Sequence, residues 1–225
     1  MPRGEITVRP RRVVVVAGTG TEVGKTFVGA ALAKELLAHR RSVIARKPAQ
    51  SYDETDLSTD AAVLGAATGE APEVVCPSHR WYPVPMAPPM AAAALDRDAF
   101  TVADLAAETE ASWASPNVEA AVALVETAGG AWSPQASDGA HAGDFADALS
   151  ADAVLLVADA GLGVINAVRG ALAALGTDRP VVIVVLNRYD ENDALHVANK
   201  EWLVHRDHLS VVTDAAEAAA ALVSL

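Results

Sequence analysis

A glycine-rich segment ending in Gly-Lys-Thr constrains the fold of this chain more than any other feature. It reads GTGTEVGKT over residues 18–26 and directly follows the apolar run VVVVA at 13–17. A run of β-branched residues is typical of a strand buried on both faces, and residues 25–37 have helix-forming composition. In that context the loop turns backbone N–H groups toward phosphate oxygens, and the helix dipole adds positive potential. The sequence therefore predicts a nucleoside triphosphate site.

The loop itself supplies two side chains with expected roles. Lys25 is expected to contact the β and γ phosphates as a point charge, and the Thr26 hydroxyl to coordinate Mg²⁺. Five residues rather than the usual four separate Gly18 from Gly24, a departure that narrows the class of phosphate loop. The flanking strand and helix argue against a chance Gly-Lys-Thr. We assign to the nucleotide the loop residues and their flank: Thr21, Glu22, Val23, Gly24, Lys25, Thr26 and Phe27.

Length and composition favour one α/β domain and exclude several partners. We expect a domain at 13–225 of the 225 residues, preceded by a solvated N-terminal extension at 1–12. A net charge of −12 with only 4% aromatic residues provides neither a basic surface nor a stacking platform for nucleic acid. No stretch approaches the roughly 20 apolar residues of a membrane span, and Cys76 has no partner for a disulfide. A cytoplasmic protein without membrane contact is expected.

Strand-like and helix-like segments alternate along the chain. Short apolar runs, mostly β-branched, recur at 13–17, 43–45, 121–125, 153–158 and 181–186. Segments of helical composition lie at 25–38, 60–68, 103–114, 166–175, 194–205 and 215–222. Alternation of this kind predicts a parallel sheet with helices on both faces, of the P-loop NTPase type.

Polar residues follow each predicted strand, where ligands collect in parallel sheets. They include Lys47, Glu126, Asp159 and Asn187. The proline-rich segment 81–89 is unsuited to a central strand and forms either a pocket wall or a packed loop. Residues 133–144, rich in Ser, Gly, Asp and His, predict a mobile loop.

Several motifs in order resemble those of the dethiobiotin synthetase family, from about Val13 to Asn187. The phosphate loop fits that family's longer form GTxTxVGKT. The other matching features are Lys47-Pro48 followed by Ser51, Asp60 opening a helix, Pro85-Met86-Ala87-Pro88, Glu126-Thr127-Ala128-Gly129-Gly130, Leu162-Gly163-Val164-Ile165-Asn166, and Asn187 after the fifth strand. An ordered set is far more specific than any one motif.

The resemblance implies the closing of a ureido ring in biotin biosynthesis. The reactants would be ATP, Mg²⁺ as cofactor, CO₂ and 7,8-diaminononanoate, with ADP, phosphate and dethiobiotin as products. An amine that has captured CO₂ is a carbamate, which becomes electrophilic once its oxygen is phosphorylated. Phosphoryl transfer depends on charge neutralisation and hard oxygen ligands for Mg²⁺. The catalytic cations would be Lys25 and Lys47, and the metal ligands Thr26, Asp60 and Glu126.

The resemblance also implies substrate and base contacts. Lys47, Ser51, Pro85 and Ala87 would bind the diamine or its carbamate, while Gly129 and Asn187 would join Glu126 at the nucleotide. The segment Gly163, Val164, Ile165 and Asn166 would cap the substrate carboxylate from the partner subunit of a homodimer. Two alternatives stay open on the residues alone. Asp53, Glu54 or Asp56 can replace Asp60, and Asn187 is either a reader of adenine or a buried turn residue.

Three departures from the family pattern define the rival interpretations. Thr127 replaces a glycine, which would strain the turn if its φ were positive. Ala167 occupies a position where members of the family often have histidine. The part of the chain after Asn187 is shorter than in the family pattern, which favours relaxed nucleotide selectivity. A partitioning or regulatory ATPase of the same superfamily is the main alternative, although the early loop lysine of those proteins is missing here. Cobyrinate-type amidation would need a glutaminase domain, and a relative without synthetase activity is the third possibility.

Overall fold

The computed structural model describes residues 9–113, 121–176 and 180–225. Most of the expected extension at 1–12, and position 114 at the end of one predicted helix, lie outside these residues. Strand β1 already begins at Arg12, one residue before the expected domain start. Within the described ranges, no helix is both long enough and apolar enough to cross a bilayer.

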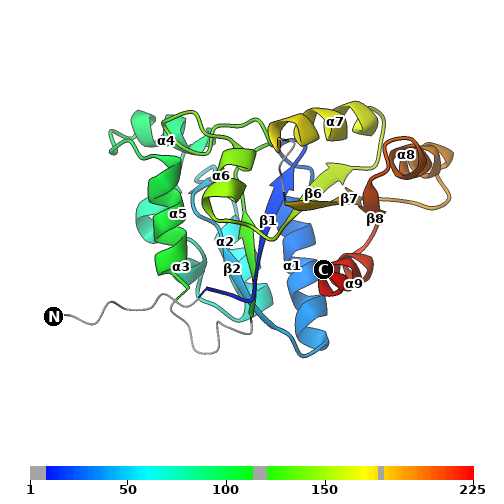
Figure 1. Cartoon of the computed structure of the whole chain (residues 1–225). Coiled ribbons are helices and arrows are strands. Elements are labelled where there is room, and N and C mark those ends of the chain that lie inside the picture. Colours follow the sequence, from blue (N-terminus) through cyan, green and yellow to red (C-terminus); the bar gives the residue numbers. More distant parts are fainter. Residues whose placement is uncertain (1–8, 114–120, 177–179) are drawn as a thin grey trace.

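A parallel sheet of six strands forms the centre of the molecule, in the order β2-β5-β1-β6-β7-β8 (Figure 1). Its strands are β1 (Arg12–Gly18), β2 (Ser42–Arg46), β5 (Ala121–Glu126), β6 (Ala153–Asp159), β7 (Val181–Asn187) and β8 (Ser210–Val212). The predicted fold class is confirmed, and each predicted strand is present with one or two further residues. Strand β8 was not predicted, because three residues at a sheet edge carry too short an apolar pattern.

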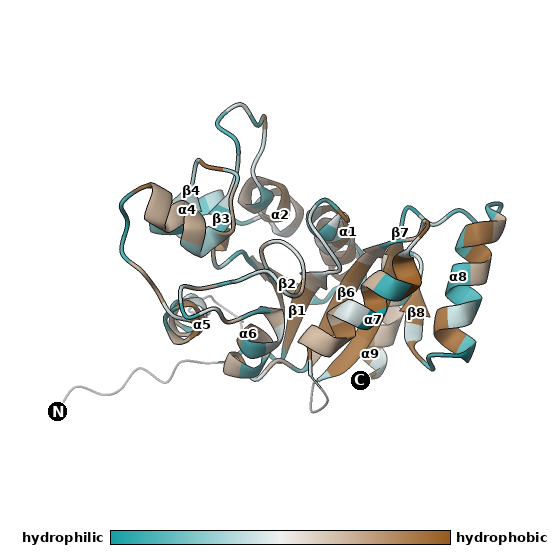
Figure 2. Cartoon of the chain, turned by 90° about the horizontal axis from the view of Figure 1, so that it is seen from above, coloured by the Kyte–Doolittle hydropathy of each residue, from teal (hydrophilic) through white to brown (hydrophobic). Residues whose placement is uncertain are grey.

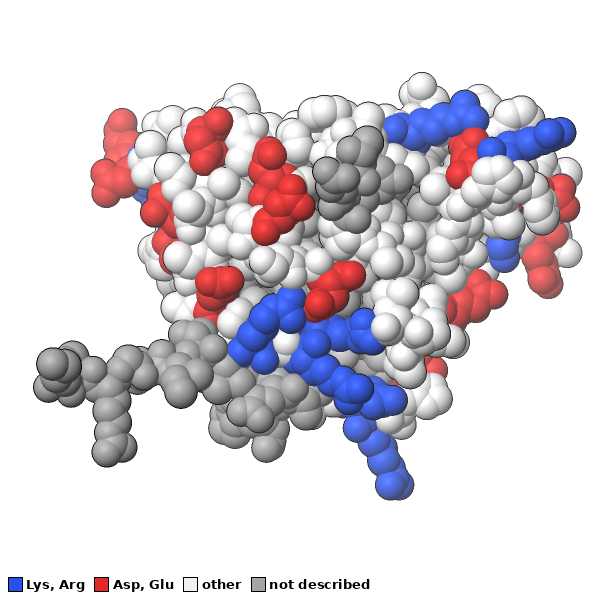
Figure 3. Space-filling view, viewed as in Figure 1, with Lys and Arg blue, Asp and Glu red and all other residues white. Residues whose placement is uncertain are grey.

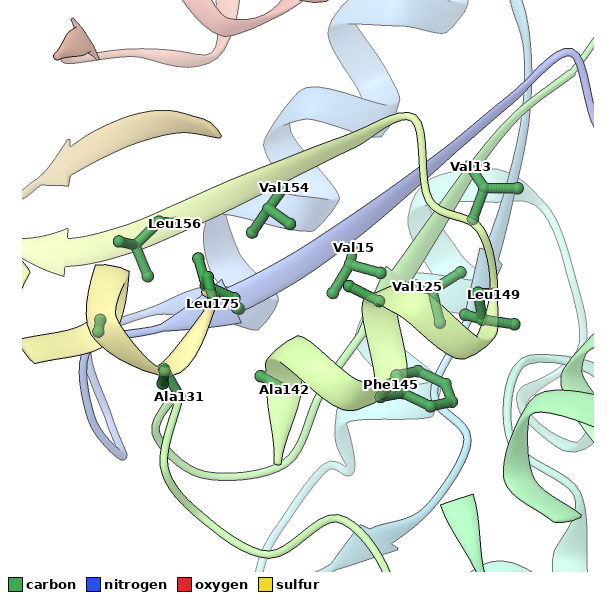
Figure 4. Close-up of a cluster of buried hydrophobic side chains, with 14 of the residues drawn as sticks. Val13, Val15, Val125, Ala131, Ala142, Phe145, Leu149, Val154, Leu156 and Leu175 are labelled. Carbon is green, nitrogen blue, oxygen red and sulfur yellow. The ribbon is translucent and has the colours of Figure 1, made fainter. Parts of the chain in front are cut away.

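Helices cover both faces of the sheet. One face carries α1 (Lys25–Ala38), α2 (Asp60–Thr68) and α9 (Ala215–Ser224), and the other carries α5 (Val102–Ala111), α6 (Ala142–Ala148), α7 (Val164–Ala174) and α8 (Ala194–His205). Figure 2 shows α1 and α2 on one side of the strands and α6 and α7 on the other. The buried side chains of β1 alternate between the layers, with Val14 and Val16 in one core and Val13 and Val15 in the other. Figure 4 shows this second core, to which β1 contributes Val13 and Val15 and α6 contributes Phe145.

A small parallel strand pair lies apart from the main sheet. Strands β3 (Gln50–Ser51) and β4 (Trp81–Tyr82) pair with each other, and α3 (Pro72–Val75), a 3₁₀ turn (Ser78–Arg80) and α4 (Pro88–Ala94) accompany them. The segment 81–89 therefore avoids the central sheet, as its prolines require. Pro88 opens α4 at a position where the missing N–H costs nothing.

The structure corrects three segment predictions. Helix α7 starts at Val164 rather than 166, because Gly163, with φ 93°, ends the preceding turn and is its N-cap. Helix α5 runs from Val102 to Ala111 instead of 103–114. Residues 133–144 are not simply a mobile loop. The buried side chain of Gln135 bonds both backbone groups of Ala128, at 2.9 Å and 2.8 Å, and the last residues belong to α6.

Basic side chains lie close together near the N-terminal end of β1 and the C-terminal end of α1. Figure 3 shows this cluster on the lower part of the molecule in the view of Figure 1. Arg11, Arg12 and Arg41 line one shallow depression there, together with Leu36 of α1. The cluster lies at the amino ends of the strands, away from the carboxyl ends that carry the predicted site.

Candidate nucleotide and metal site

A cavity of about 430 Å³ opens where the phosphate loop meets the carboxyl ends of β2 and β5. Its walls come from segments far apart in sequence: the phosphate loop, the first residue of α2, the proline-rich segment and the turn after β5. The lining residues are Thr21, Glu22, Gly24, Lys25, Thr26, Lys47, Ser51, Asp60, Pro85, Met86, Ala87, Pro88, Glu126, Ala128, Gly129 and Ser133. The fold thus brings most of the predicted site residues into one space.

The phosphate loop leads into α1 without a side-chain cap. Gly24 is the N-cap, with φ 95° in the left-handed region, and within the described part of the chain no side-chain cap bonds the first-turn N–H groups. These donors and the helix dipole suit a phosphate. A Cβ at Gly24 would lie 2.1 Å from Asn187 Nδ2, so glycine is required both for its conformation and for space.

Lys25 is nearly buried beside the loop backbone. Its Nζ donates to the carbonyl of Gly20 at 3.2 Å. Burial, and then the nearby ammonium of Lys47, lower the pKa of Lys25 from its ordinary value. A bound anion such as a phosphate would stabilise the charged form of Lys25, because its negative charge would offset part of the cost of burial and of the repulsion from Lys47.

Lys47 and two carboxylates form a compact cluster beside Thr26. Lys47 Nζ lies 2.6 Å from Glu126 Oε1 and 2.8 Å from Asp60 Oδ2. Thr26 Oγ1 lies 2.8 Å from Asp60 Oδ1 and 3.0 Å from Glu126 Oε1. Lys47 also donates to the Thr127 carbonyl at 3.2 Å. Four side chains from α1, α2, β5 and the end of β2 therefore share one network.

Burial and charge act against each other in this cluster. Complete burial raises the pKa of Glu126, since the attraction of Lys47 does not fully offset desolvation. Asp60 is also desolvated, but Lys47 outweighs that effect and lowers its pKa. Burial works against the charged form of Lys47 too, yet Glu126 and Asp60 together raise its pKa. The two carboxylates thus form a binding place for a cation.

The donor set fits Mg²⁺. Among the described residues, no group of three or more His, Cys, Asp or Glu side chains could hold a metal ion by itself. Mg²⁺, however, is commonly bound through one or two carboxylates together with phosphate oxygens and water. The buried Glu126 Oε2 has no hydrogen-bond partner among the described residues, which leaves this oxygen available as a ligand for a cation. Of the four acids considered for this metal position, only Asp60 lines the cavity; Asp53, Glu54 and Asp56 do not, and Asp53 and Asp56 bond to each other within an exposed turn.

The proline-rich segment forms a wall of the cavity. Ser51, on β3, donates from Oγ to the Met86 carbonyl at 2.5 Å, which ties the strand pair to this wall. Pro85 and Ala87 line the same side. Of the two interpretations that the sequence left open for this segment, the structure supports the pocket wall.

Thr127 fits its turn without backbone strain. The described non-glycine residues with positive φ do not include it, and Gly129, with φ 63°, takes the left-handed conformation instead. Thr127 is buried and its N–H donates to the Val16 carbonyl at 3.1 Å. The strain considered from the sequence is therefore absent.

Sequence reasoning missed Ser133. Its Oγ accepts a 2.9 Å hydrogen bond from the Gly130 N–H, and it lines the cavity beside Gly129. A serine in a Ser- and Gly-rich stretch gives no distinguishing signal, so only the folded turn reveals its place.

Other predicted site residues lie outside the cavity wall. Phe27 is 69% exposed on the first turn of α1. The Asn187 amide donates to the Val23 carbonyl at 2.9 Å, so its donor supports the phosphate loop. Asn166 lines a neighbouring depression together with Thr19 and Gly20, and residues 163–165 line neither space.

Comparisons with known proteins show which family the chain resembles. A family model described as an AAA domain matches residues 12–216. The chain is 37% identical to the ATP-dependent dethiobiotin synthetase BioD of Anaeromyxobacter dehalogenans, over 89% of each chain. It is 35% identical to the enzyme of the same name from Rhodococcus erythropolis, over 85% of this chain and 82% of that protein.

Solved structures resemble the fold at low identity. The signal recognition particle receptor FtsY of Elizabethkingia anophelis superposes with a TM-score of 0.52 at 14% identity, covering 89% of this chain and 57% of that one. A candidate plasmid partition protein of Borrelia burgdorferi, solved with AMPPNP, has a TM-score of 0.52 at 12% identity, covering 92% and 87%.

Fold and site together define a phosphate-loop nucleotide-binding protein of the parallel α/β class. The identities with curated relatives narrow that class further. The chain belongs to the ATP-dependent dethiobiotin synthetase family.

Proposed function

We propose that this chain closes the ureido ring of dethiobiotin from 7,8-diaminononanoate and CO₂ at the expense of ATP. One observation supports this most strongly. One cavity contains the phosphate loop and the cluster of Lys47, Asp60, Glu126 and Thr26. The proline-rich segment forms a further wall of this cavity, and a bound phosphate group would not require that wall. A nucleotide at the loop would leave space for a second reactant between the cluster and the wall.

One amine of the diamine first adds to CO₂ and loses a proton to give a carbamate, and two substitutions follow. A carbamate oxygen on the substrate attacks the γ phosphorus of ATP, the bond to ADP breaks, and a mixed anhydride forms. The neighbouring amine then attacks the carbonyl carbon, phosphate leaves, and the amine loses a proton as the ring closes. Both steps build negative charge on oxygens, which positioned cations stabilise.

The residues of the cavity have separate tasks in this scheme. Lys25 neutralises the transferred phosphoryl group from the loop side, and Lys47 holds the carbamate and the γ phosphate from the opposite side. Thr26, Asp60 and Glu126 would hold Mg²⁺, which when bound neutralises charge on the phosphates. Ser51 offers a hydroxyl to the diamine or carbamate, while Pro85 and Ala87 exclude water from the reacting centre.

We also propose a homodimer in the cytoplasm. Leu162, which precedes α7, is 91% exposed, and an apolar side chain in that position suits a subunit contact. In this arrangement Gly163 and Asn166 of one subunit would approach the carboxylate of the substrate bound to the other.

The test is a product assay. Purified protein is incubated with ATP, Mg²⁺ and bicarbonate, with and without 7,8-diaminononanoate, while phosphate release and dethiobiotin mass are followed. Diamine-dependent phosphate release with dethiobiotin in equal amount is expected. Release that ignores the diamine would instead favour a switch ATPase, and ATP binding without release would indicate a relative that has lost the synthetase reaction.

A further inference from the structure

Two consecutive residues at the end of β7 hold two consecutive carbonyls of the phosphate loop. Asn187 Nδ2 donates to the Val23 carbonyl at 2.9 Å, and an Arg188 guanidinium nitrogen donates to the Glu22 carbonyl at 3.1 Å. The other terminal nitrogen of Arg188 donates to Asp159 Oδ2 at 2.6 Å. We refer to Asn187, Arg188 and Asp159 as the β7 clasp.

The sheet register places the parts of the clasp together. Asp159 ends β6 and lies opposite Asn187 in the parallel pair β6–β7. Asp159 Oδ1 also accepts a hydrogen bond from the Gly161 N–H at 3.0 Å, so both carboxylate oxygens are engaged. The carboxylate is therefore anchored to its own turn while it orients the Arg188 fork.

The loop residue that Arg188 holds is in an unfavourable conformation. Glu22 has φ 60°, in the left-handed region that L-residues other than Asn and Asp seldom adopt. Such a residue keeps its conformation only when its surroundings hold it. The hydrogen bonds to the Glu22 and Val23 carbonyls are contacts of that kind.

We propose that Arg188, oriented by Asp159, is a positioning residue that keeps the phosphate loop in its binding conformation before a nucleotide arrives. The inference rests on the proposed nucleotide site but not on the diamine chemistry. A preformed loop binds phosphate more tightly because less conformational entropy is lost on binding.

A simpler role for Arg188 is attraction of phosphate by its charge alone. The two roles predict opposite effects at Asp159. Asp159→Asn removes a negative charge and keeps a carbonyl oxygen at the turn, so a purely electrostatic role predicts tighter nucleotide binding. Loss of the carboxylate that orients Arg188 predicts weaker binding.

The experiment measures MgADP affinity by calorimetry and deuterium uptake of the nucleotide-free phosphate loop by mass spectrometry. We expect Arg188→Ala to weaken MgADP about tenfold, the effect of one charged hydrogen bond, and to speed exchange at residues 19–24. Arg188→Lys should fail to restore affinity, because one ammonium cannot reproduce the fork, and Asp159→Asn should weaken binding about threefold.

The matched control is Arg169→Ala. Arg169 also pairs with an aspartate through two hydrogen bonds, at 2.9 Å and 2.6 Å to Asp207, and its side chain is 55% exposed against 58% for Arg188. It lies on α7, but its hydrogen bonds go to Asp207 rather than to the phosphate loop, so affinity and loop exchange should stay as in the wild type.

Three results would overturn the proposal: wild-type affinity in Arg188→Ala, full rescue by lysine, or tighter binding in Asp159→Asn. Wild-type protein that binds no MgADP would also overturn it, together with the nucleotide site. If MgADP binds as expected but no dethiobiotin forms, the proposed synthetase function is wrong, while the proposed role of the β7 clasp is still supported.

Discussion

At the scale of single residues, the phosphate loop depends on a glycine that no other residue can replace. Gly24 combines φ 95° with a position where a Cβ would lie 2.1 Å from Asn187 Nδ2. A methyl group there must push the Asn187 amide away from the Val23 carbonyl. The left-handed conformation of residue 24 and its close contact with the distant Asn187 thus both require glycine at this position.

Gly24→Ala should abolish measurable MgADP binding. The strain of a left-handed alanine costs about 1 kcal/mol, and displacement of Asn187 additionally deforms the loop. Calorimetry with MgADP and a denaturation curve check this. Gly139→Ala is the control, since Gly139 has φ 83° but nothing within 4 Å of an added Cβ. It should lose similar stability and bind MgADP normally. Normal binding by Gly24→Ala would contradict the expected deformation of the loop.

The same scale decides what happens when Lys47 is removed. Among the described residues, its ammonium is the only cation within ion-pair distance of both Glu126 and Asp60. Lys47→Met should end ring closure and also lower the unfolding free energy by about 3 kcal/mol, because two carboxylates lose their counter-ion. Denaturant titration checks the stability, and the dethiobiotin assay checks the activity.

A double variant provides the control for that prediction. Adding Glu126→Gln to Lys47→Met removes one uncompensated charge, so most of the lost stability should return while activity stays absent.

Mg²⁺ without nucleotide should raise the melting temperature of Lys47→Met more than that of the wild type, since the metal can replace the ammonium. If Mg²⁺ leaves the melting temperature of Lys47→Met unchanged, the cluster does not bind the metal without a nucleotide.

At the scale of elements, Glu108 connects α5 to the segment that precedes β4, through Arg80 and through His79 Nε2 at 3.1 Å. Arg80 donates to Glu108 at 2.6 Å and 2.9 Å, and its guanidinium lies 4.1 Å from the Phe100 ring centre. Partial burial opposes ionisation of Glu108, but hydrogen bonds from Arg80 outweigh it and lower the pKa below the ordinary value of 4.5. The pair helps to hold the β3–β4 unit, and with it the cavity wall, against the main domain.

Glu108→Gln should therefore lower stability near neutral pH by about 1 kcal/mol, a value kept small because the carboxylate is partly exposed. A lowered folded pKa means that the contribution is present above pH 4.5 and is lost as the pH falls through the folded value. The difference between variant and wild type should accordingly shrink in acid. Urea titrations from pH 7 to pH 3 measure it. Glu110→Gln, at an exposed position on the same helix, should show no such trend.

The elements also separate what local pattern predicts from what it does not. Helices α1, α2 and α8 have the predicted bounds, because each begins at a recognisable break and has helical composition throughout. Strands β3 and β4 have two residues each and exist only because they pair with each other. No periodicity can be detected in two residues, so the strand pair that carries the cavity wall was invisible in the sequence.

At the scale of the whole molecule, the proposed dimer is the feature with the largest functional consequence. Leu162→Asp should convert a dimer to a monomer, since a carboxylate cannot be buried in an apolar contact. Sedimentation velocity checks the mass. The KM for the diamine should rise about tenfold or more, with MgADP affinity unchanged, because only the substrate carboxylate loses a contact to the partner subunit.

Val223→Asp is the control for that experiment. Val223 is 50% exposed on α9, which covers the opposite face of the sheet from α7, so its substitution should leave mass and KM unchanged. A Leu162→Asp protein with the wild-type mass would show that α7 does not form the interface.

The sequence by itself determined the fold class, the phosphate loop and the residues that follow each strand. Those features depend on local pattern: apolar runs specify buried strands, and the strand–loop–helix unit around Lys25 specifies a phosphate site. Parallel strands then bring Lys47 and Glu126 to one edge.

Only the tertiary structure decided how those residues contact one another. It showed Lys47 between Asp60 and Glu126, Ser133 on the cavity wall, and Arg188 on the Glu22 carbonyl. Each contact joins residues distant in sequence, and its existence depends on register, side-chain direction and burial. These quantities arise when the layers pack, so no local pattern in the chain encodes them.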